Sequence, residues 1–362
     1  MRRKSLPVKV GNVTVGGEAP VSIQSMTNTD TSDIKATLKQ INELFEAGCE
    51  IVRVAVTDES DAKSLSTIKK NSPLPVVADI QFDYRLALLC LEDGADKIRI
   101  NPGNIGGNDK LARIIQKAKE KGIPLRIGVN SGSIRRELRM KYGGATADAL
   151  VESALQTIKF LEENSFQDIV VSLKAANVVT TVDAYRKIAE RMPYPLHLGV
   201  TEAGRGLKGA IKSSLGIGSL LLDGIGDTVR VSLTGDPVKE IYVAKEILQA
   251  AGSRNFGPDI ISCPTCARCK IDLENLVDKV EEAVKHINWP LKIAVMGCPV
   301  NGPGEAREAD IGISGGNNFG VIFKEGKVLK KVAPHKLFKA LEKEIMEIVK
   351  QKISENTTRN GG

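Results

Sequence analysis

Four of the six cysteines lie close together in the last third of the sequence. Cys263, Cys266 and Cys269 form a Cys-x-x-Cys-x-x-Cys run, and Cys298 follows, directly before Pro299. Thiolates at this spacing can surround one metal centre, and both structural zinc sites and [4Fe–4S] clusters use Cys-x-x-Cys pairs. The spacing favours an iron–sulfur cluster because ferredoxin runs also end in Cys-Pro. Structural zinc and buried thiols remain the alternatives.

Basic residues stand inside apolar segments of the first 240 residues, where packing alone does not explain them. Arg53, Arg99, Arg126 and Arg230 each have apolar neighbours in the chain, and Lys174 closes another apolar segment. Several buried cations are costly unless an anion compensates them. Arginine is suited to bidentate contact with phosphate. The pattern therefore predicts a phosphate or diphosphate ligand.

Other polar residues accompany these cations at the ends of the apolar segments. They are Asp79, Asn101, Asn130, Thr201, Glu202 and Ser232. The glycine-rich segment after residue 202 adds Lys212 and a predicted helix N-terminus, which is a common phosphate position in barrels. His197 lies inside an apolar segment and is expected to be a core histidine rather than a catalyst. With three histidines and no His-x-x-x-His pair, a zinc hydrolase site is poorly supplied.

The elements that must position these residues alternate between short β-branched segments and amphipathic helical ones. This alternation is typical of parallel βα units, and eight such units fit a closed (β/α)₈ TIM barrel better than an open sheet. Active-site residues of such barrels lie at the C-terminal ends of the strands. The predicted strands are 21–26, 50–56, 75–80, 97–101, 124–130, 168–174, 195–200 and 227–233.

A smaller α/β unit is expected after the barrel. The barrel should occupy residues 1–250, followed by a Gly/Pro-rich linker at 251–259 and a cysteine-bearing iron–sulfur domain at 260–352. Residues 353–362 are expected to form a disordered tail. Within the second domain, the predicted elements are a helix near 271–287, strands at 291–297 and 310–314, a hairpin turning at 325–326, and a helix at 335–352.

Composition narrows the classes of function. The chain has 362 residues, a formal net charge of +7 and one tryptophan. No basic segment is interleaved with aromatic residues, so nucleic-acid binding is not expected. No apolar stretch is long enough to span a membrane, and the first residues do not resemble a signal peptide. A cytoplasmic protein is therefore expected, in which Cys49 and Cys90 are inert buried thiols.

Several longer motifs together resemble one family. The segments QSMTNTDT (24–31), RINPGNIG (99–106), RIGVNSGS (126–133), HLGVTEAG (197–204) and MGCPVNGPGEA (296–306) are similar to the bacterial 4-hydroxy-3-methylbut-2-enyl diphosphate synthases. The similarity extends over nearly the whole chain. It implies reductive ring opening of 2-C-methyl-D-erythritol 2,4-cyclodiphosphate to the allylic diphosphate, with electrons from flavodoxin or ferredoxin.

The resemblance also implies roles for individual residues. A [4Fe–4S] cluster would be held by Cys263, Cys266, Cys298 and Glu305, and Glu202 would donate a proton near the reacting centre. The substrate contacts implied by the resemblance are Arg53, Arg99, Asn101, Arg126, Asn130, Lys174, Ser232 and Asn301. Lys212 and Arg230 join this set because of their charge and position.

The spacing of the residues alone does not decide which residue is the fourth cluster ligand, since both Cys269 and Glu305 are candidates. A weakly held carboxylate leaves one iron exchangeable for a substrate oxygen, whereas four thiolates saturate the cluster. This argument favours Glu305. Two further departures from the family are Gln81, where many relatives have histidine, and Pro299, which replaces an aliphatic residue.

The predicted last barrel helix would run about 22 Å away from the barrel mouth, and a nine-residue linker spans at most about 30 Å. A head-to-tail homodimer is therefore expected, in which the cluster of one chain serves the barrel of the other. Two alternative hypotheses for the function remain. One is a barrel enzyme of the dihydropteroate-synthase type with a zinc module, and the other is a basic nucleic-acid-binding protein with a zinc ribbon.

Overall fold

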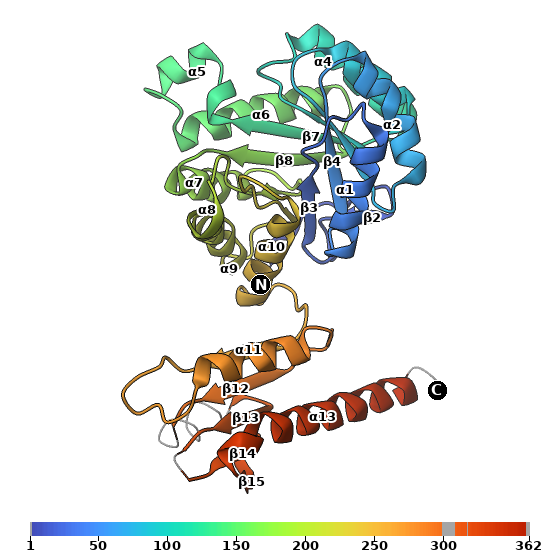
Figure 1. The fold of residues 1–362 in the computed structure, drawn as a ribbon. Coiled ribbons are helices and arrows are strands. Elements are labelled where there is room, and N and C mark those ends of the chain that lie inside the picture. The colour runs from blue at the N-terminus through green and yellow to red at the C-terminus, as the bar shows by residue number, and fades with distance from the viewer. Residues whose placement is uncertain (1, 299–307, 317, 360–362) are drawn as a thin grey trace. The chain divides into compact units, whose positions relative to one another are not determined.

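The computed structural model describes residues 2–298, 308–316 and 318–359. The chain forms two compact units that divide after Arg254. Unit 1 contains an eight-stranded parallel sheet with the strand order β8-β7-β6-β5-β4-β3-β10-β9. A parallel bridge between Val171 and Leu196 joins the two ends of this order and closes the barrel. The predicted TIM barrel is therefore confirmed (Figure 1).

All eight predicted strands are present at the predicted places. They are β3 (Ser22–Met26), β4 (Ile51–Val56), β5 (Val76–Ile80), β6 (Lys97–Ile100), β7 (Leu125–Asn130), β8 (Ile169–Lys174), β9 (His197–Leu198) and β10 (Thr228–Val229). The last two are much shorter than predicted, because ladder pairing there stops after two residues.

Helices follow the strands and cover the barrel. They are α1 (Ile34–Glu46), α2 (Glu59–Asn71), α3 (Tyr84–Glu92), α4 (Asn108–Lys121), α5 (Arg136–Lys141), α6 (Ala147–Glu163), α7 (Val178–Ala189), α8 (Gly206–Ser213), α9 (Ser219–Leu222) and α10 (Val238–Ala250). Several begin with a short polar residue that caps the first turn: Asp33 accepts from the Ala36 amide, and Asn177 from the Thr180 amide. Each cap fixes where the chain leaves a strand end and turns back along the barrel.

A short hairpin that the sequence analysis did not predict precedes the barrel. It pairs β1 (Val8–Val10) with β2 (Val13–Val15), and Gly11 supplies the left-handed conformation (φ 58°) of the turn. Val10 and Val15 pack against Ile51 and Val77, which lie at the starts of β4 and β5. The hairpin therefore covers the N-terminal end of the barrel, opposite the predicted active site.

The described part of unit 2 is a five-stranded mixed sheet with two helices. The strands, in sheet order, are β11 (Asp259–Ser262), β12 (Lys292–Met296), β13 (Ile311–Ser314), β14 (Gly320–Lys324) and β15 (Lys327–Val332). The first three are parallel to one another, and β14 and β15 form the predicted hairpin. Glu325 and Gly326 both have positive φ at its turn.

The described residues of unit 2 form helices α11 (Leu273–Val284) and α13 (Leu337–Arg359). Val280 and Leu341 belong to one core cluster with Ile293 and Ile313, so both helices pack on the same side of the sheet. The helix predicted for 335–352 continues to Arg359.

Candidate active site

The inside of the barrel is charged, whereas most TIM barrels fill this space with apolar side chains. In the ladder register Arg99 stands between Asp79 and Arg126, and Lys97 stands beside Val77. Neighbouring residues in register point to the same face of a parallel sheet. These side chains are almost completely buried, with exposed fractions of 5% for Arg99, 1% for Arg126 and 0% for Lys97.

Asp79 is the carboxylate that two of the arginines share. Its Oδ1 lies 2.8 Å from Nη1 of Arg99, and its Oδ2 lies 3.5 Å from Nε of Arg53. The Gln81 amide also donates to Oδ1 at 3.2 Å. Burial alone would raise the pKa of Asp79, but Arg53, Arg99 and Arg126 together hold it below its usual value. Asp79 is therefore an ionised acceptor that orients Arg53 and Arg99.

Glu240, in the first turn of α10, is the carboxylate that orients Arg230. Its Oε2 lies 3.5 Å from Nε of Arg230 and accepts a hydrogen bond from the Ser25 hydroxyl at 3.0 Å. Its Oε1 accepts from the Leu233 amide at 3.0 Å. The helix after the eighth strand thus fixes both Arg230 and the loop in which Ser232 lies.

Three further cations have no such partner. Among the described residues, Nε and Nη1 of Arg126 and Nζ of Lys97 have no hydrogen-bond partner at all. Burial lowers the pKa of Arg126, Lys97 and Lys174 well below their ordinary values. Neighbouring positive charges lower them further; Arg126, for example, lies near both lysines.

The described part of the barrel interior therefore holds six cations against two carboxylates. The cations are Arg53, Arg99, Arg126, Arg230, Lys97 and Lys174. A buried charge without a counter-charge is strongly unfavourable. A ligand with several negative charges, such as the predicted phosphate or diphosphate, would supply the missing counter-charge.

Two glycines make room for these long side chains. A Cβ at Gly128 would lie 2.6 Å from Nε of Arg99, and one at Gly199 would lie 2.5 Å from Nζ of Lys174. Real Cβ atoms do not approach so closely, so neither cation could keep its position beside alanine. The barrel backbone is therefore shaped around the charged side chains.

Sequence reasoning did not identify Lys97, Gln24 or Thr228, and it expected His197 to be a core histidine. Gln24, His197 and Thr228 are buried, and each has a side-chain polar atom without a partner among the described residues. His197 is completely buried, and burial together with Arg126 lowers its pKa well below the usual value, so its ring is neutral. The pairing of His197 with Thr228 places both in one row of the barrel wall.

The remaining predicted contacts lie at the mouth. Asn101 follows β6 and is buried, while Asn130 ends β7 and is half-buried. Ser232 is half-buried after β10. Glu202 is exposed and has a left-handed backbone (φ 54°), which is uncommon for a residue other than glycine. Lys212, in contrast, lies in the last turn of α8, about 9 Å along the helix from its first residue.

In unit 2 the cysteines gather at one end of the sheet. Cys263 follows β11 and Cys298 follows β12, so both leave the C-terminal ends of neighbouring parallel strands. The Gly297 amide donates to Sγ of Cys263 at 3.2 Å, and the Lys270 amide donates to the Gly297 carbonyl at 3.1 Å. The cysteine loop thus folds back on the strand end that carries Cys298.

The individual thiols differ in their surroundings. Hydrogen bonds from Arg268, first from its backbone and then from its guanidinium, lower the pKa of the exposed Cys266, which favours the thiolate that binds metals. Cys269 is half-buried against the core, and its Sγ contacts the Ile271 carbonyl at 3.3 Å. Cys49 and Cys90 are buried, and burial raises the pKa of both to about 12, which disfavours their thiolate forms.

These surroundings fit a metal cluster in donor type, since amide donors to cysteine sulfur are a feature of iron–sulfur sites. The side chains described do not by themselves form a closed group of three metal ligands. The predicted ligand Glu305, the predicted substrate contact Asn301 and the unusual Pro299 lie outside the described residues.

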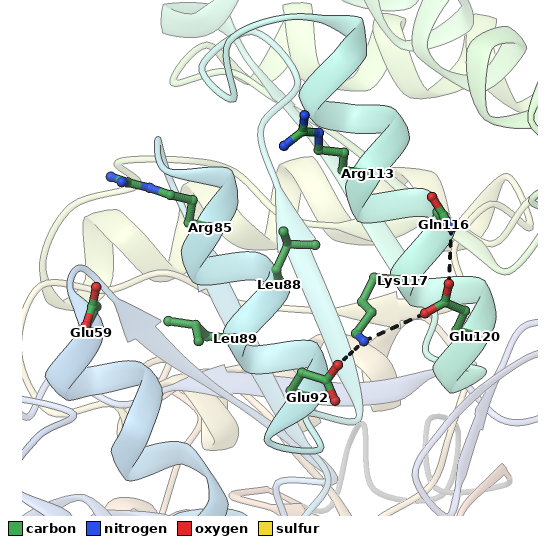
Figure 2. Close-up of a pocket in the computed structure, with 9 residues that line it drawn as sticks. All are labelled: Glu59, Arg85, Leu88, Leu89, Glu92, Arg113, Gln116, Lys117 and Glu120. Atoms are coloured by element: carbon green, nitrogen blue, oxygen red, sulfur yellow. Dashed lines mark hydrogen bonds and ion pairs between the residues drawn. The ribbon is translucent and has the colours of Figure 1, made fainter.

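A separate hollow of about 600 Å³ lies on the outside of the barrel between α3 and α4. Figure 2 shows Leu88 and Leu89 along it and Lys117 between Glu92 and Glu120. Lys117 pairs with both glutamates, whereas Arg126 and Lys97 inside the barrel have polar nitrogens without a partner. The hollow shows no unpaired buried charge that would attract a reacting anion.

A closed parallel barrel with an excess of buried cations, joined to a cysteine-bearing α/β unit, defines a two-domain TIM-barrel protein. Residues 5–245 match the GcpE TIM-barrel domain, and residues 259–347 match the GcpE protein C-terminal domain. The chain belongs to the GcpE family.

Curated relatives match along nearly their whole length. A protein of Clostridium perfringens is 56% identical over 347 residues, which is 96% of this chain and 99% of the relative. One of Caldanaerobacter subterraneus is 55% identical over 351 residues, 97% of this chain and 99% of the relative. Both are named 4-hydroxy-3-methylbut-2-en-1-yl diphosphate synthase (flavodoxin).

Solved structures support the barrel fold alone. The type I 3-dehydroquinate dehydratase of Clostridium difficile superposes with a TM-score of 0.51 at 13% sequence identity. The superposed region covers 70% of this chain and 100% of the dehydratase. Such low identity says nothing about the reaction.

Proposed function

We propose that this chain catalyses the reductive ring opening of 2-C-methyl-D-erythritol 2,4-cyclodiphosphate to 4-hydroxy-3-methylbut-2-enyl diphosphate. The reaction breaks the C–O bond that closes the diphosphate ring and removes one hydroxyl group as water. Two electrons and two protons are consumed for each product molecule. The names of relatives more than 50% identical support the proposal.

The observation that carries the proposal is the set of unpaired cations inside the barrel. Arg126 and Lys174 have no carboxylate partner among the described residues, whereas Arg53 and Arg99 are oriented by Asp79. A diphosphate can satisfy several such donors at once. Binding also places the carbon skeleton at the mouth, where Asn101, Asn130 and Ser232 can donate or accept hydrogen bonds.

Glu202 is the proposed proton donor. It stands at the mouth in an unusual backbone conformation, and such conformations are concentrated at functional sites. Its carboxyl group would deliver the proton that the departing hydroxyl needs. Because the side chain is exposed, it can be reprotonated from solvent after each turnover.

We also propose that unit 2 holds a [4Fe–4S] cluster through Cys263, Cys266, Cys298 and Glu305. When bound, such a cluster supplies single electrons and a Lewis-acidic iron. Around it, the amide of Gly297 and the guanidinium of Arg268 would hydrogen-bond the ligand sulfurs. Among the described thiols, Cys269 is directed toward the Ile271 carbonyl and is proposed to be a bystander.

The proposal includes a head-to-tail homodimer in the cytoplasm that accepts electrons from flavodoxin or ferredoxin. Among the described residues, no helix combines the length and apolar character needed to cross a bilayer. Mixing an Arg126→Ala chain with a Cys298→Ser chain should restore activity through one intact composite site. Absence of complementation despite proven subunit exchange would contradict the dimer.

Anaerobic purification followed by metal analysis and turnover tests the proposed function. We expect iron and acid-labile sulfide near four of each per chain, and formation of the allylic diphosphate with a chemical reductant. Zinc in place of iron would favour either rival, the dihydropteroate-synthase-type enzyme or the nucleic-acid-binding protein. An intact iron–sulfur cluster without turnover of the cyclodiphosphate would refute the substrate assignment.

A further inference from the structure

One corner of unit 2 combines an exposed aromatic ring with several lysines. Phe319 is 46% exposed, and Nζ of Lys331 lies 4.8 Å from the centre of its ring. The first turn of α13 adjoins this pair, because a Cβ at Gly320 would touch the Leu337 side chain. We define the Phe319 surface as Phe319, Lys331, His335, Lys336 and Lys339, all of which are exposed.

This surface lies at the same end of the sheet as the cysteines. β14 runs antiparallel to β13, so the start of β14 is level with the end of β13. In register, Ser314 pairs with Val321, which pairs with Lys331. The Ser314 hydroxyl donates to the Cys298 carbonyl at 2.8 Å. Three strand spacings, about 14 Å, separate β12 from β15.

Positive charge is concentrated here. Residues 324–343 contain seven lysines and two glutamates. Glu344 pairs with Lys330 at 2.6 Å, and Glu347 pairs with Lys343 at 3.8 Å. Within the described ranges, no ion pair engages Lys331, Lys336 or Lys339. The Phe319 surface therefore carries uncompensated positive charge.

Protection of a sheet edge explains only part of this arrangement. Lysines on an edge strand discourage pairing with other chains, and β15 is such an edge. An exposed phenylalanine works against that protection. An aromatic centre surrounded by charges is instead typical of a protein-binding surface, and brief electron-transfer encounters use small surfaces of this kind.

We propose that the Phe319 surface docks the electron donor, an acidic carrier protein with a reduced flavin. The inference rests on the proposed function and adds the place where the donor binds. One electron passes from the flavin to the iron–sulfur centre in each encounter, so two encounters supply one turnover. Acidic groups of the carrier face the lysines, and Phe319 forms the apolar contact at the centre.

The test compares two reductants on the reconstituted holoenzyme at low ionic strength. The double variant Lys331→Glu/Lys336→Glu should lower kcat/KM for reduced flavodoxin about tenfold or more, because opposite charges steer association. Turnover with dithionite-reduced methyl viologen should remain at the wild-type rate. The matched control is Lys279→Glu/Lys350→Glu, which makes the same charge change at exposed sites of α11 and distal α13 and should behave as wild type with both reductants.

Two further measurements separate charge from contact and binding from catalysis. Phe319→Ala should raise the KM for flavodoxin while leaving the salt dependence of the rate intact. Titration calorimetry with oxidised flavodoxin should show weaker binding to the Lys331→Glu/Lys336→Glu variant than to the control.

Equal effects of the test and control variants would overturn the proposal, as would an equal loss of rate with both reductants. If flavodoxin binds as described but wild-type holoenzyme turns over with neither reductant, the proposed reaction fails while the docking surface stands.

Discussion

Replacement of Arg126 by methionine should make the ligand-free protein more stable. Arg126 is 1% exposed, two of its nitrogens have no partner among the described residues, and its neighbours include Arg53 and Arg99. Methionine keeps a similar length and removes the charge. Exchanging buried charged groups for apolar ones of similar volume can stabilise a protein by about 1–4 kcal/mol. We expect Arg126→Met to raise the free energy of unfolding by an amount in that range.

Arg99→Met is the matched control, because Arg99 is also almost completely buried but has a partner. Its Nη1 lies 2.8 Å from Asp79. Removing one member of a buried ion pair costs about 3–5 kcal/mol, and Arg53, at 3.5 Å, can compensate only part of it. We therefore expect Arg99→Met to destabilise the same barrel that Arg126→Met stabilises.

Urea unfolding can follow the two units separately. The single tryptophan, Trp289, lies in unit 2, and all five tyrosines lie in unit 1. Tyrosine absorbance and far-ultraviolet circular dichroism should report the shifts of the barrel, while tryptophan fluorescence should report an unchanged transition of unit 2. Destabilisation by Arg126→Met of more than about 1 kcal/mol would refute the reasoning, because it would mean that Arg126 has a compensating partner in the ligand-free protein.

Three other predictions concern the barrel site and the proposed cluster of unit 2. Gly128→Ala should weaken cyclodiphosphate binding at least about tenfold, a loss of about 1.4 kcal/mol, because the new Cβ displaces Arg99. The control Gly132→Ala, whose new Cβ has nothing within 4 Å, should bind the cyclodiphosphate as wild type does. Equal affinities of the two variants in calorimetry would contradict the role of Gly128 in positioning Arg99. The lowered pKa of Lys97 means that the unfolded chain binds more protons, so the unfolding free energy of the ligand-free barrel should rise with pH toward about 10.4. Lys97→Met should reduce the dependence of the unfolding free energy on pH, measured by urea titrations at several pH values. An unchanged dependence would show that Lys97 does not cause it. In anaerobic spectra and assays, Cys269→Ser should keep both the cluster and turnover, whereas Glu305→Ala should lose turnover; the reverse result would make the ligands four cysteines.

Much of the barrel could be predicted from the sequence because its signals are local. Each strand is a short β-branched segment, and each of the four arginines has apolar neighbours, as Arg99 has between two isoleucines. The hairpin at Val8–Val15 gives a weaker signal because its strands have three residues each, although β-branched residues flank a Gly-Asn turn.

The partners of the cations could not be predicted, because they depend on register and on distant elements. Lys97 looks like the exposed start of a strand, and only its pairing beside Val77 shows that it lies inside the barrel. Glu240 comes from a helix, where a glutamate in the first turn is ordinary. Which arginines are paired with carboxylates therefore emerged only from the three-dimensional arrangement.

The most direct test of the central claim is a calorimetric titration of the protein with the cyclodiphosphate, without a reductant. The account predicts one ligand per chain and about 10- to 150-fold weaker binding for Arg126→Met and for Lys174→Met, corresponding to about 1.5–3 kcal/mol for each charge-assisted contact. Arg113→Met, on the outer surface of α4, should bind as wild type. Wild-type affinity in both barrel variants would contradict the claim that the unpaired cations form the diphosphate site.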